Sequence, residues 1–288
     1  MSDPLRSMTF VPAYNTRFLD KAITFASDAL ILDLEDAVPW DYKQQARDNL
    51  RSYLDAGSFS QAVYVRVNAI DTGLLLKDLE AALHPRTSGI MFTKIRDERD
   101  IVYLDKLLSQ LESDLGFEDG TFTMCPLIET ASAVMRAYEI ATASPRMIAL
   151  TFGAEDYLRE LDGLHLEHGA SLLVPRSMIV MAARAAGIEP IDTPYLDIRN
   201  LAGLERELLL ARELGFSGSL LLHPSHIQAA NAVFAPSEAE IAEARSIIDA
   251  IEASAATGSG VALIDGKLVG PPMEKRARAV LAKAGLER

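Results

Sequence analysis

The stretch ALILDLEDAV, residues 29–38, begins as an aliphatic run and ends among three acidic side chains. An apolar run of this length is typical of a fully buried strand in a parallel sheet. The amphipathic stretch at residues 42–56 follows and is typical of a helix. A buried strand that passes through an acidic loop into a helix is half of a βαβ unit, so this segment predicts an α/β fold.

The same order of strand and helix repeats along the chain. About eight such strands favour a closed (β/α)8 TIM barrel over an open doubly wound sheet. No predicted strand is followed by GxGxxG or GxxxxGK[ST], so a nucleotide phosphate loop is not predicted. The predicted strands are residues 8–11, 29–34, 62–67, 89–93, 122–128, 147–152, 188–191 and 219–222, and the predicted helices are residues 16–26, 42–56, 74–83, 98–115, 132–143, 177–186 and 201–214.

The pattern changes near residue 235, which predicts a catalytic barrel over residues 1–235 and an extension over residues 236–288. The extension reads as a helix, a small-residue linker, a short hairpin around an Asp265-Gly266 turn and a terminal helix. A barrel does not need this segment for closure. We therefore expect it to form a lid or to pack on a neighbouring subunit.

Composition and charge exclude several function classes. The 288 residues include 28 Lys and Arg against 41 Asp and Glu, a formal net charge of −13. Nucleic-acid binders and proteins on anionic membranes need a broad cationic face, so we expect neither partner. A single cysteine, Cys125, no secretory segment in the first residues and no apolar run of about 18 residues favour a cytoplasmic protein.

Charged side chains fall where the predicted strands end. In a barrel the carboxyl ends of all strands lie on one rim, where catalytic groups gather. Chance would scatter such residues between both ends, so we treat them as candidate site residues. In chain order they are Asp33, Glu35, Asp36, Arg66, Asn68, Lys94, Glu129, Glu155, Asp156, Asp192 and His223.

Glu129 and Asp156 are the candidate metal ligands. They lie one β/α repeat apart, so we expect them at adjacent strand ends on the same rim. Two hard carboxylates without a neighbouring His or Cys suit Mg²⁺, which keeps water or substrate oxygens as its other ligands. The alternative is that Glu129 caps a helix beginning near Ser132, since acids are favoured near the amino ends of helices.

Arg66 ends an apolar strand, where an arginine is unusual. Its planar fork suits a carboxylate or a developing enolate oxygen. It can equally form a structural ion pair with Asp33, Glu35 or Asp36, and the two roles are compatible.

Two more features of the rim also have two interpretations each. The Gly153-Ala154 turn either lets backbone N–H groups approach a ligand closely or simply marks a tight turn. Lys94 is either a nucleophile that forms a Schiff base with a keto substrate or an ion-pair partner of neighbouring carboxylates.

Several of these stretches together resemble the citrate lyase β-subunit-like family of the HpcH/HpaI aldolase superfamily, which also contains malyl-CoA and citramalyl-CoA lyases. The resemblance extends over nearly the whole chain in the expected order, and LDLEDAV and FGAED are its specific motifs. The stretches are Val11-Pro12, residues 30–38, residues 65–68, residues 127–130, residues 152–156 and His223-Pro224.

The resemblance implies a (β/α)8 barrel that assembles as homotrimers or hexamers and holds Mg²⁺ on Glu129 and Asp156. It implies that Arg66 contacts substrate and that the Gly153-Ala154 turn receives the carboxylate of a keto acid, so these residues and Glu129 form the predicted substrate site. The family reaction is reversible Claisen-type cleavage of a 3-hydroxyacyl thioester, usually a CoA ester, to acetyl-CoA and a 2-keto acid.

One position departs from the family pattern. Acyl-CoA members carry an aspartate, which reaches a neighbouring active site as acid or base, where this chain has Gly270. We therefore expect weak thioester hydrolysis and weak enolisation of acetyl-CoA unless another residue serves as base. The candidates are Glu35 and Asp36, followed by Asp192.

The sequence thus predicts a Mg²⁺-dependent carbon–carbon lyase acting on a short 3-hydroxyacyl thioester, with Arg66, Glu35 and Asp36 as its catalytic residues. One alternative is a metal-dependent aldolase acting on a free hydroxy-keto acid, which needs no CoA site. Another is a non-catalytic subunit that binds a keto acid or CoA without turnover.

Overall fold

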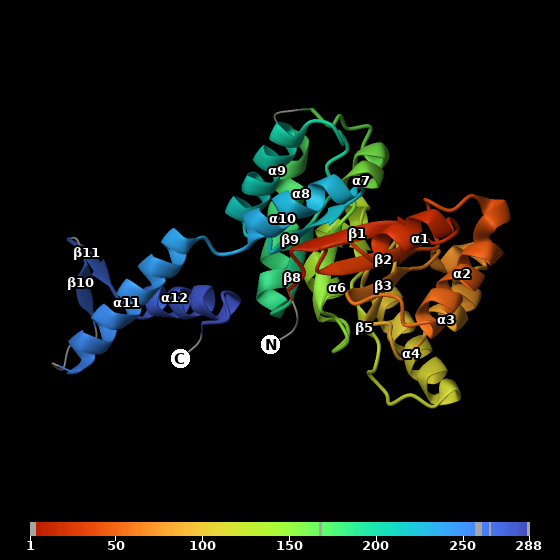
Figure 1. Ribbon diagram of the computed structural model, residues 1–288, viewed down its shortest axis with the longest axis horizontal. Helices are drawn as coiled ribbons and strands as arrows, with labels where there is room; N and C mark the ends of the chain where they lie inside the picture. The colour runs from red at the N-terminus through yellow and green to blue at the C-terminus, as the bar shows by residue number, and fades with distance from the viewer. Residues whose placement is uncertain (1–3, 167–168, 257–260, 265, 287–288) are drawn as a thin grey trace. The chain divides into compact units, whose positions relative to one another are not determined.

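Every predicted strand overlaps a strand of the computed structural model, which describes residues 4–166, 169–256, 261–264 and 266–286. Within these residues nine strands form one parallel sheet in the order β5-β4-β3-β2-β1-β9-β8-β7-β6 (Figure 1). The carboxyl ends of all nine therefore lie at one edge. The strands are β1 (Ser7–Pro12), β2 (Ala29–Asp33), β3 (Ala62–Arg66), β4 (Gly89–Met91), β5 (Thr123–Met124), β6 (Leu127–Ile128), β7 (Ala149–Phe152), β8 (Glu189–Asp192) and β9 (Gly218–Leu221).

The sheet curls into a TIM-barrel-like fold because its two edge strands are consecutive in the chain. Only Cys125 and Pro126 separate β5 from β6, and proline has no N–H for the hydrogen-bond ladder. The N–H of Cys125 donates to the carbonyl of Ile90 on one side (3.0 Å), and the N–H of Met124 donates to Arg146 on the other (2.8 Å). The predicted fifth strand is therefore two short strands that bond to both neighbours.

One apolar cluster fills the interior of the curled sheet. Its members come from strands on all sides, as the layered core of a barrel requires. Cys125 belongs to it and is fully buried. The cluster is Met8, Ala29, Ile31, Tyr64, Met91, Cys125, Leu127, Ala149, Ile191 and Leu220.

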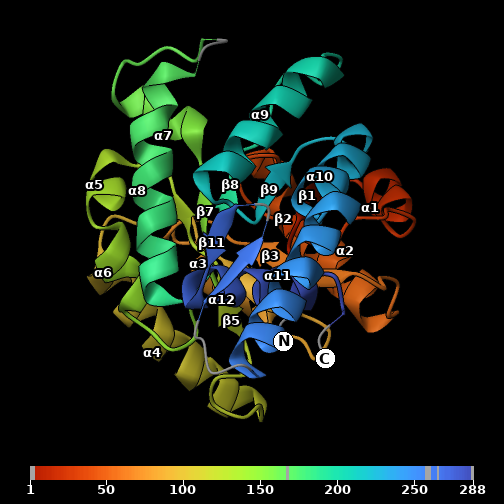
Figure 2. The ribbon, with the colours of Figure 1, turned by 90° about the vertical axis from the view of Figure 1, so that its left-hand side faces the viewer.

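Helices lie around the outside of these strands, as Figure 2 shows for α1, α2, α4, α6, α8 and α9. Each predicted helix overlaps an observed one, although residues 132–143 form two helices that meet at Arg136. The helices of this part of the chain are α1 (Thr16–Ala22), α2 (Lys43–Asp55), α3 (Leu75–Ala82), α4 (Glu98–Leu115), α5 (Ala131–Met135), α6 (Ala137–Thr142), α7 (Ala154–Glu160), α8 (Ala170–Ala186), α9 (Leu201–Leu214) and α10 (Ile227–Phe234), with short 3₁₀ helices at Trp40–Tyr42, Ile70–Thr72 and Pro224–His226.

Some helices differ from the prediction in where they begin or in whether they are predicted at all. α8 begins seven residues before its predicted start at Ser177, with Pro175 inside it. The burial of Leu172 and Pro175 offsets the one hydrogen bond that proline removes. Neither α7 nor α10 is among the predicted helices, and for α7 the sequence indicates only a turn at Gly153-Ala154.

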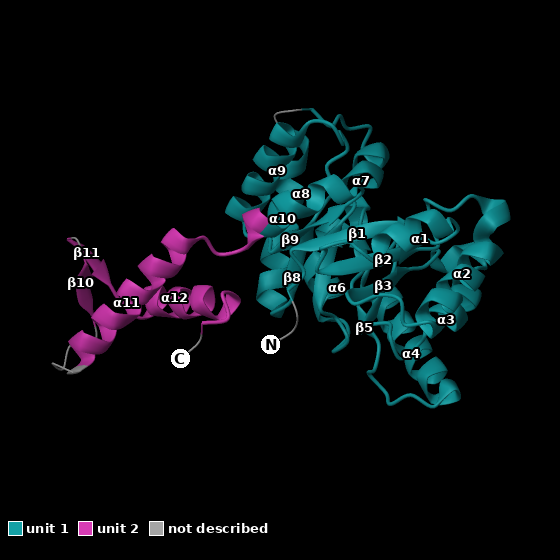
Figure 3. Cartoon of the chain, viewed as in Figure 1, with its two compact units in different colours: residues 1–231 teal, residues 232–288 magenta. Residues whose placement is uncertain are grey.

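The chain divides into two compact units, residues 1–231 and 232–288 (Figure 3). The second unit contains α11 (Glu238–Ala256), a hairpin of β10 (Ala262–Ile264) and β11 (Lys267–Val269), and α12 (Pro271–Lys283), in the predicted order. Asp265 of the predicted turn lies outside the described residues. The small core of the second unit joins α11 to α12 through Ala244, Ile248, Ala277 and Leu281. None of the described helices is long and apolar enough to cross a membrane.

Candidate active site

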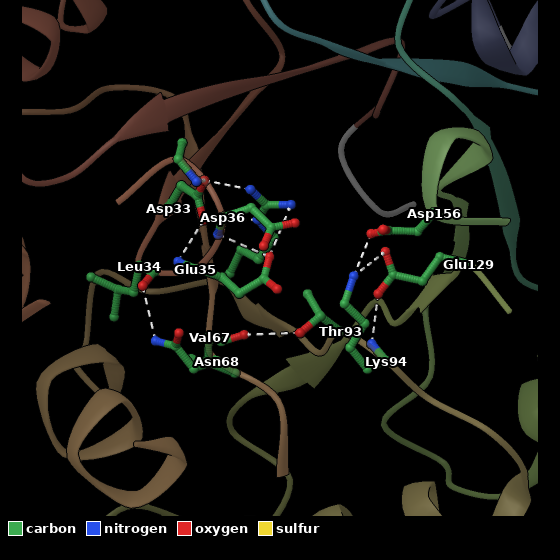
Figure 4. Close-up of polar contacts among 12 residues, drawn as sticks. Asp33, Leu34, Glu35, Asp36, Val67, Asn68, Thr93, Lys94, Glu129 and Asp156 are labelled. Carbon is green, nitrogen blue, oxygen red and sulfur yellow. Dashed lines mark hydrogen bonds and ion pairs between the residues drawn. The ribbon is translucent and has the colours of Figure 1, made fainter. Parts of the chain in front are cut away.

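Six of the predicted site residues form two clusters at the carboxyl ends of the strands. The arginine cluster is Asp33, Glu35 and Arg66, from the ends of β2 and β3. The lysine cluster is Lys94, Glu129 and Asp156, which follow β4, β6 and β7. Figure 4 shows the three side chains of the lysine cluster pointing toward one another. Each cluster consists of two carboxylates and one cation.

Arg66 is fixed in the arginine cluster by both acids. Its Nε donates to Asp33 Oδ1 (2.7 Å), its Nη2 donates to Asp33 Oδ2, and its Nη1 lies 3.3 Å from Glu35 Oε2. The guanidinium also stacks over the ring of Phe10, 4.5 Å from its centroid. Within the described part of the chain, these contacts engage three of its five N–H donors.

Glu35 is the acid of this cluster with a strongly shifted pKa. Glu35 is 6% exposed. Burial raises the pKa of its carboxyl to about 7, although the charge of Arg66 opposes the shift. The charge of Lys94 also acts on it, which links the two clusters electrostatically. A carboxyl that titrates near neutral pH is suited to accept and return a proton during turnover.

Two buried polar residues hold the loop after β2: Lys43, which is not among the predicted site residues, and the predicted rim residue Asn68. Lys43 Nζ donates to the carbonyls of Leu34 and Glu35, both at 2.7 Å. Asn68 Nδ2 donates to the carbonyl of Leu34 (2.9 Å) and to Asp78 Oδ2 (2.6 Å). The signal was available, because Lys43 falls on the apolar stripe of α2 with Ala46, Arg47, Leu50 and Leu54.

Lys94 contacts both acids of the lysine cluster with its ammonium. Nζ lies 3.4 Å from Glu129 Oε2 and is hydrogen-bonded to Asp156 Oδ2. The backbone N–H of Lys94 also donates to Glu129 Oε1 (2.6 Å). Its φ of 56° lies in the left-handed region, which non-glycine residues seldom occupy. Arg159 contacts Asp156 from the solvent side, with Nη2 2.6 Å from Oδ1.

The pKa values of the lysine cluster follow from burial and from these contacts. Burial raises the pKa of Glu129 to about 8 against the opposing charge of Lys94. Burial also raises the pKa of Asp156, but hydrogen bonds with Lys94 and Glu129 outweigh it and hold that pKa below its usual value. Burial lowers the pKa of Lys94, yet the charge of Glu129 and the bond to Asp156 raise it overall. A Schiff-base lysine needs the opposite shift.

Gly153 makes room for Glu129. A Cβ at residue 153 would lie 2.7 Å from Glu129 Cβ and 3.0 Å from Glu129 Oε2. Its φ of −106° suits any residue, so space rather than backbone conformation requires glycine here. The turn N–H groups already have partners, since Gly153 donates to Ile128 (2.9 Å) and Ala154 to Thr193 Oγ1 (3.2 Å). A substrate carboxylate at this turn must displace Thr193.

The lysine cluster fits a small divalent cation. Two carboxylates from adjacent strand ends converge, one of them almost fully buried, and their charge is balanced by a side-chain cation. The alternative of a helix cap is wrong, because Thr130 Oγ1 caps α5 by accepting from Ala133 (3.1 Å). Across the described residues, no group of three or more His, Cys, Asp or Glu side chains could hold a metal. A metal here would therefore need water or substrate oxygens, as Mg²⁺ readily accepts.

Other predicted rim residues do not join either cluster. Asp36 is exposed, and its backbone N–H donates to Glu35 Oε2 (3.0 Å). Asp192 is buried and pairs with Arg176, whose Nη2 lies 3.0 Å from its Oδ2. Glu155 pairs with His165, with Oε1 2.8 Å from Nδ1. Of the three predicted bases, Glu35 is thus the one that belongs to a cluster.

Comparison with known proteins identifies the family of the chain. A family model described as HpcH/HpaI aldolase/citrate lyase matches residues 6–224. The citrate lyase subunit beta of Escherichia coli K12 is 36% identical over 282 residues, which cover 98% of this chain and 93% of that protein. A (3S)-malyl-CoA thioesterase of Cereibacter sphaeroides KD131 is 35% identical over 282 residues, covering 98% and 95% of the two chains.

Among solved structures, the protein CitE from Mycobacterium tuberculosis in complex with magnesium, acetoacetate and coenzyme A is similar over its whole length. The TM-score is 0.79 at 30% sequence identity, with 99% of this chain and 98% of that chain covered. A second crystal structure of CitE from that organism, with magnesium and pyruvate, covers 81% of this chain at 31% identity and a TM-score of 0.68.

Proposed function

Because the chain belongs to the HpcH/HpaI aldolase/citrate lyase family, we propose that it is a Mg²⁺-dependent carbon–carbon lyase. It cleaves, or in reverse forms, a short 3-hydroxyacyl thioester of CoA and releases acetyl-CoA and a 2-keto acid. The observation that carries the proposal is the pair of clusters on one rim. A carboxylate pair suited to a divalent cation, with Glu129 buried and Asp156 half-buried, shares the rim with a fixed arginine and a carboxyl with a pKa of about 7.

Glu129 and Asp156 would hold the metal. When bound there, Mg²⁺ supplies Lewis-acid polarisation of the oxygens of a keto acid. Gly153 keeps the space beside Glu129 open. Ala154 supplies the next backbone N–H, which can turn from Thr193 to the carboxylate of the substrate.

Arg66 serves the part of the substrate that becomes an enolate. Asp33 holds its fork from one side, so the orientation of the guanidinium is set before substrate arrives. The two N–H donors that remain can stabilise the developing enolate oxygen of the thioester. Such a preorganised donor contributes most when the charge develops in the transition state.

Glu35 moves the proton. In cleavage its carboxylate accepts the proton of the 3-hydroxyl, the bond between C2 and C3 breaks, and the hydroxyl carbon becomes the carbonyl of the keto acid. The electron pair of the broken bond passes into the thioester enolate, which takes up a proton at carbon to give acetyl-CoA. The exposed Asp36 beside it is the second candidate for this role.

The proposal also includes the predicted role of the extension, the oligomeric state and the localisation. We propose that residues 236–288 form a lid on a neighbouring subunit of a homotrimer or hexamer in the cytoplasm. Gly270 brings no carboxylate to such a lid. Position 270 of the extension therefore offers no acid or base to a neighbouring site.

The experiment is a substrate panel. The pure protein is incubated with Mg²⁺ and malyl-, citramalyl-, methylmalyl- or citryl-CoA, and release of keto acid is followed with and without EDTA. We expect release from at least one thioester, its loss in EDTA, and no borohydride-trapped adduct on Lys94. Cleavage of a free hydroxy-keto acid alone would instead support the aldolase. Keto-acid binding without any turnover would support a binding subunit.

A further inference from the structure

The lysine cluster places one ammonium between two acids that are themselves the proposed metal ligands. Glu129 is 2% exposed, so its charge is poorly screened by water. Lys94 Nζ is 3.4 Å from Glu129 Oε2 and hydrogen-bonded to Asp156 Oδ2. Two ionised carboxylates at such close quarters, with Glu129 buried and Asp156 half-buried, repel each other, and a cation between them relieves this repulsion. The ammonium and a metal ion cannot both occupy that place.

The backbone of Lys94 prepares this position. Its left-handed φ of 56° lets the N–H and the side chain of one residue reach the same carboxylate, the N–H at 2.6 Å from Glu129 Oε1. Non-glycine residues adopt this conformation at a cost, and such residues cluster at functional sites. The N–H contact to Glu129 does not depend on where the ammonium lies, so it persists when the side chain moves.

The side chain of Lys94 is free to leave. It is 32% exposed, on a flexible four-carbon stem, and it contacts acids only through its tip. Arg159 on the solvent side cannot replace it, because Arg159 contacts Asp156 and not Glu129. Among the described residues, the ammonium of Lys94 is thus the one cation that contacts both carboxylates.

We propose that Lys94 is a removable stand-in for the metal. Its ammonium holds Glu129 and Asp156 together when no divalent cation is bound, and it withdraws toward solvent when the cation enters. This role rests on the proposed metal site at the two acids. It predicts competition, so removal of the ammonium increases the affinity for Mg²⁺ and decreases the stability of the metal-free protein.

The test compares Lys94→Met and Lys94→Gln with the native protein by calorimetric titration of MgCl₂ into EDTA-treated, dialysed samples. Two substitutions are used because the metal-free methionine variant can fold poorly. We expect Kd for Mg²⁺ to fall at least about fivefold in both, the effect of removing one charge pair. Thermal unfolding should show a lower midpoint than the native protein in EDTA and an equal midpoint in saturating Mg²⁺.

The matched control is Arg159→Met, which removes a cation that contacts Asp156 alone. Its Kd for Mg²⁺ should change much less than in the Lys94 variants. Equal or weaker Mg²⁺ binding in both Lys94 variants, with tight binding in the native protein, overturns the stand-in role and leaves the metal site intact. Failure of the native protein to bind Mg²⁺ overturns the metal site and this inference with it.

Discussion

The arginine cluster and the lysine cluster each consist of two carboxylates and one side-chain cation on the same rim. They differ in how firmly the cation is held. Arg66 is 11% exposed, and Asp33 accepts from two nitrogens along one edge of its guanidinium while Phe10 supports its face. Lys94 is about three times as exposed at 32% and contacts its acids through a single nitrogen. One cation is fixed and the other can be exchanged.

This difference follows from the chemistry of the two side chains. A guanidinium stays charged at any accessible pH and presents several donors in a rigid plane, so two acids can fix its orientation. An ammonium is a compact charge on a flexible stem, so another cation can replace it. We conclude that the fixed half of the rim suits an oxyanion that forms during reaction, and the exchangeable half suits a metal that arrives with substrate.

The largest effect should come from the lysine cluster. Glu129→Ala or Asp156→Ala removes one of two side-chain ligands, and Mg²⁺ binds poorly to a single carboxylate, so Mg²⁺-dependent binding of pyruvate or oxaloacetate should be lost. Calorimetry measures the loss, and circular dichroism checks the fold. Glu155→Ala, whose acid pairs with His165 instead, is the matched control and should bind normally. Unchanged binding in the first two variants would remove both acids from the metal site.

A substitution in the arginine cluster should lower the rate of catalysis more than the affinity for substrate. In Arg66→Lys a point charge replaces the fork, so kcat should fall about 10²–10³-fold while KM changes much less. Steady-state kinetics with the best thioester of the panel measures both. Arg159→Lys, on an exposed side chain, is the control. Near-normal turnover of Arg66→Lys would make Arg66 only the structural partner of Asp33 and Glu35.

The pH dependence of stability should identify Glu35. Its pKa is raised from 4.5 to about 7 in the folded chain, so the folded state holds this proton where the unfolded state has released it. The free energy of unfolding should therefore fall by roughly 2–3 kcal/mol as pH rises from about 4.5 to about 7.

Glu35→Gln lacks this titration. Its free energy of unfolding should therefore increase relative to that of the native protein as pH rises over that interval. Urea unfolding at about pH 5 and about pH 8 measures the change for both proteins. Parallel pH profiles would show that Glu35 titrates normally in the folded chain, and the proposed proton transfer would lose its support.

Gly153 should be sensitive for reasons of space. In Gly153→Ala the new Cβ lies 2.7 Å from Glu129 Cβ, so Glu129 must move, at about 1–3 kcal/mol of stability and with weaker Mg²⁺ binding. Gly270→Ala is the matched control, because a Cβ there meets only Val261 Cγ1 at an ordinary 3.5 Å. Equal stability and Mg²⁺ affinity of the two variants would show that the close approach at Gly153 is unimportant.

The smallest effect should come from the extension. Gly270 has φ −148°, an extended conformation open to any residue, so Gly270→Asp should fold normally. We expect weak thioester hydrolysis and weak exchange of the acetyl-CoA methyl protons in deuterated water, with a gain below about 10²-fold in the variant. Mass spectrometry of acetyl-CoA follows the exchange. Rapid exchange by the native protein would show that a rim base, Glu35 first, already suffices.

The sequence predicted which residues share the rim, because parallel strands place their carboxyl ends at one edge and the strands were recognisable from their apolar runs. It did not predict how the rim residues pair. Arg66 could have paired with any of three acids, and the structure selects Asp33 and Glu35 over Asp36. Such choices depend on side-chain geometry to within about an ångström, which spacing along the chain does not contain.

Residues that support the site were harder to predict than residues in it. Lys43 falls on the buried stripe of an amphipathic helix, but a lysine in such a helix is normally assumed to face solvent. Arg176, which forms an ion pair with Asp192, comes from the first part of α8. This part was not predicted as helix, because Pro175 lies in it. In both cases a polar side chain lies where the local pattern predicts an apolar one or no helix.

Cys125 sits where β5 and β6 meet, buried in the core cluster, and burial raises the pKa of its thiol. As the only cysteine of the chain, it provides a natural reporter of opening. A thiol reagent can modify it only in molecules whose barrel has come apart at this seam, because the reactive species is the exposed thiolate. The labelling rate then measures how often the seam opens, and ligands that close the rim should slow it without touching the sulfur.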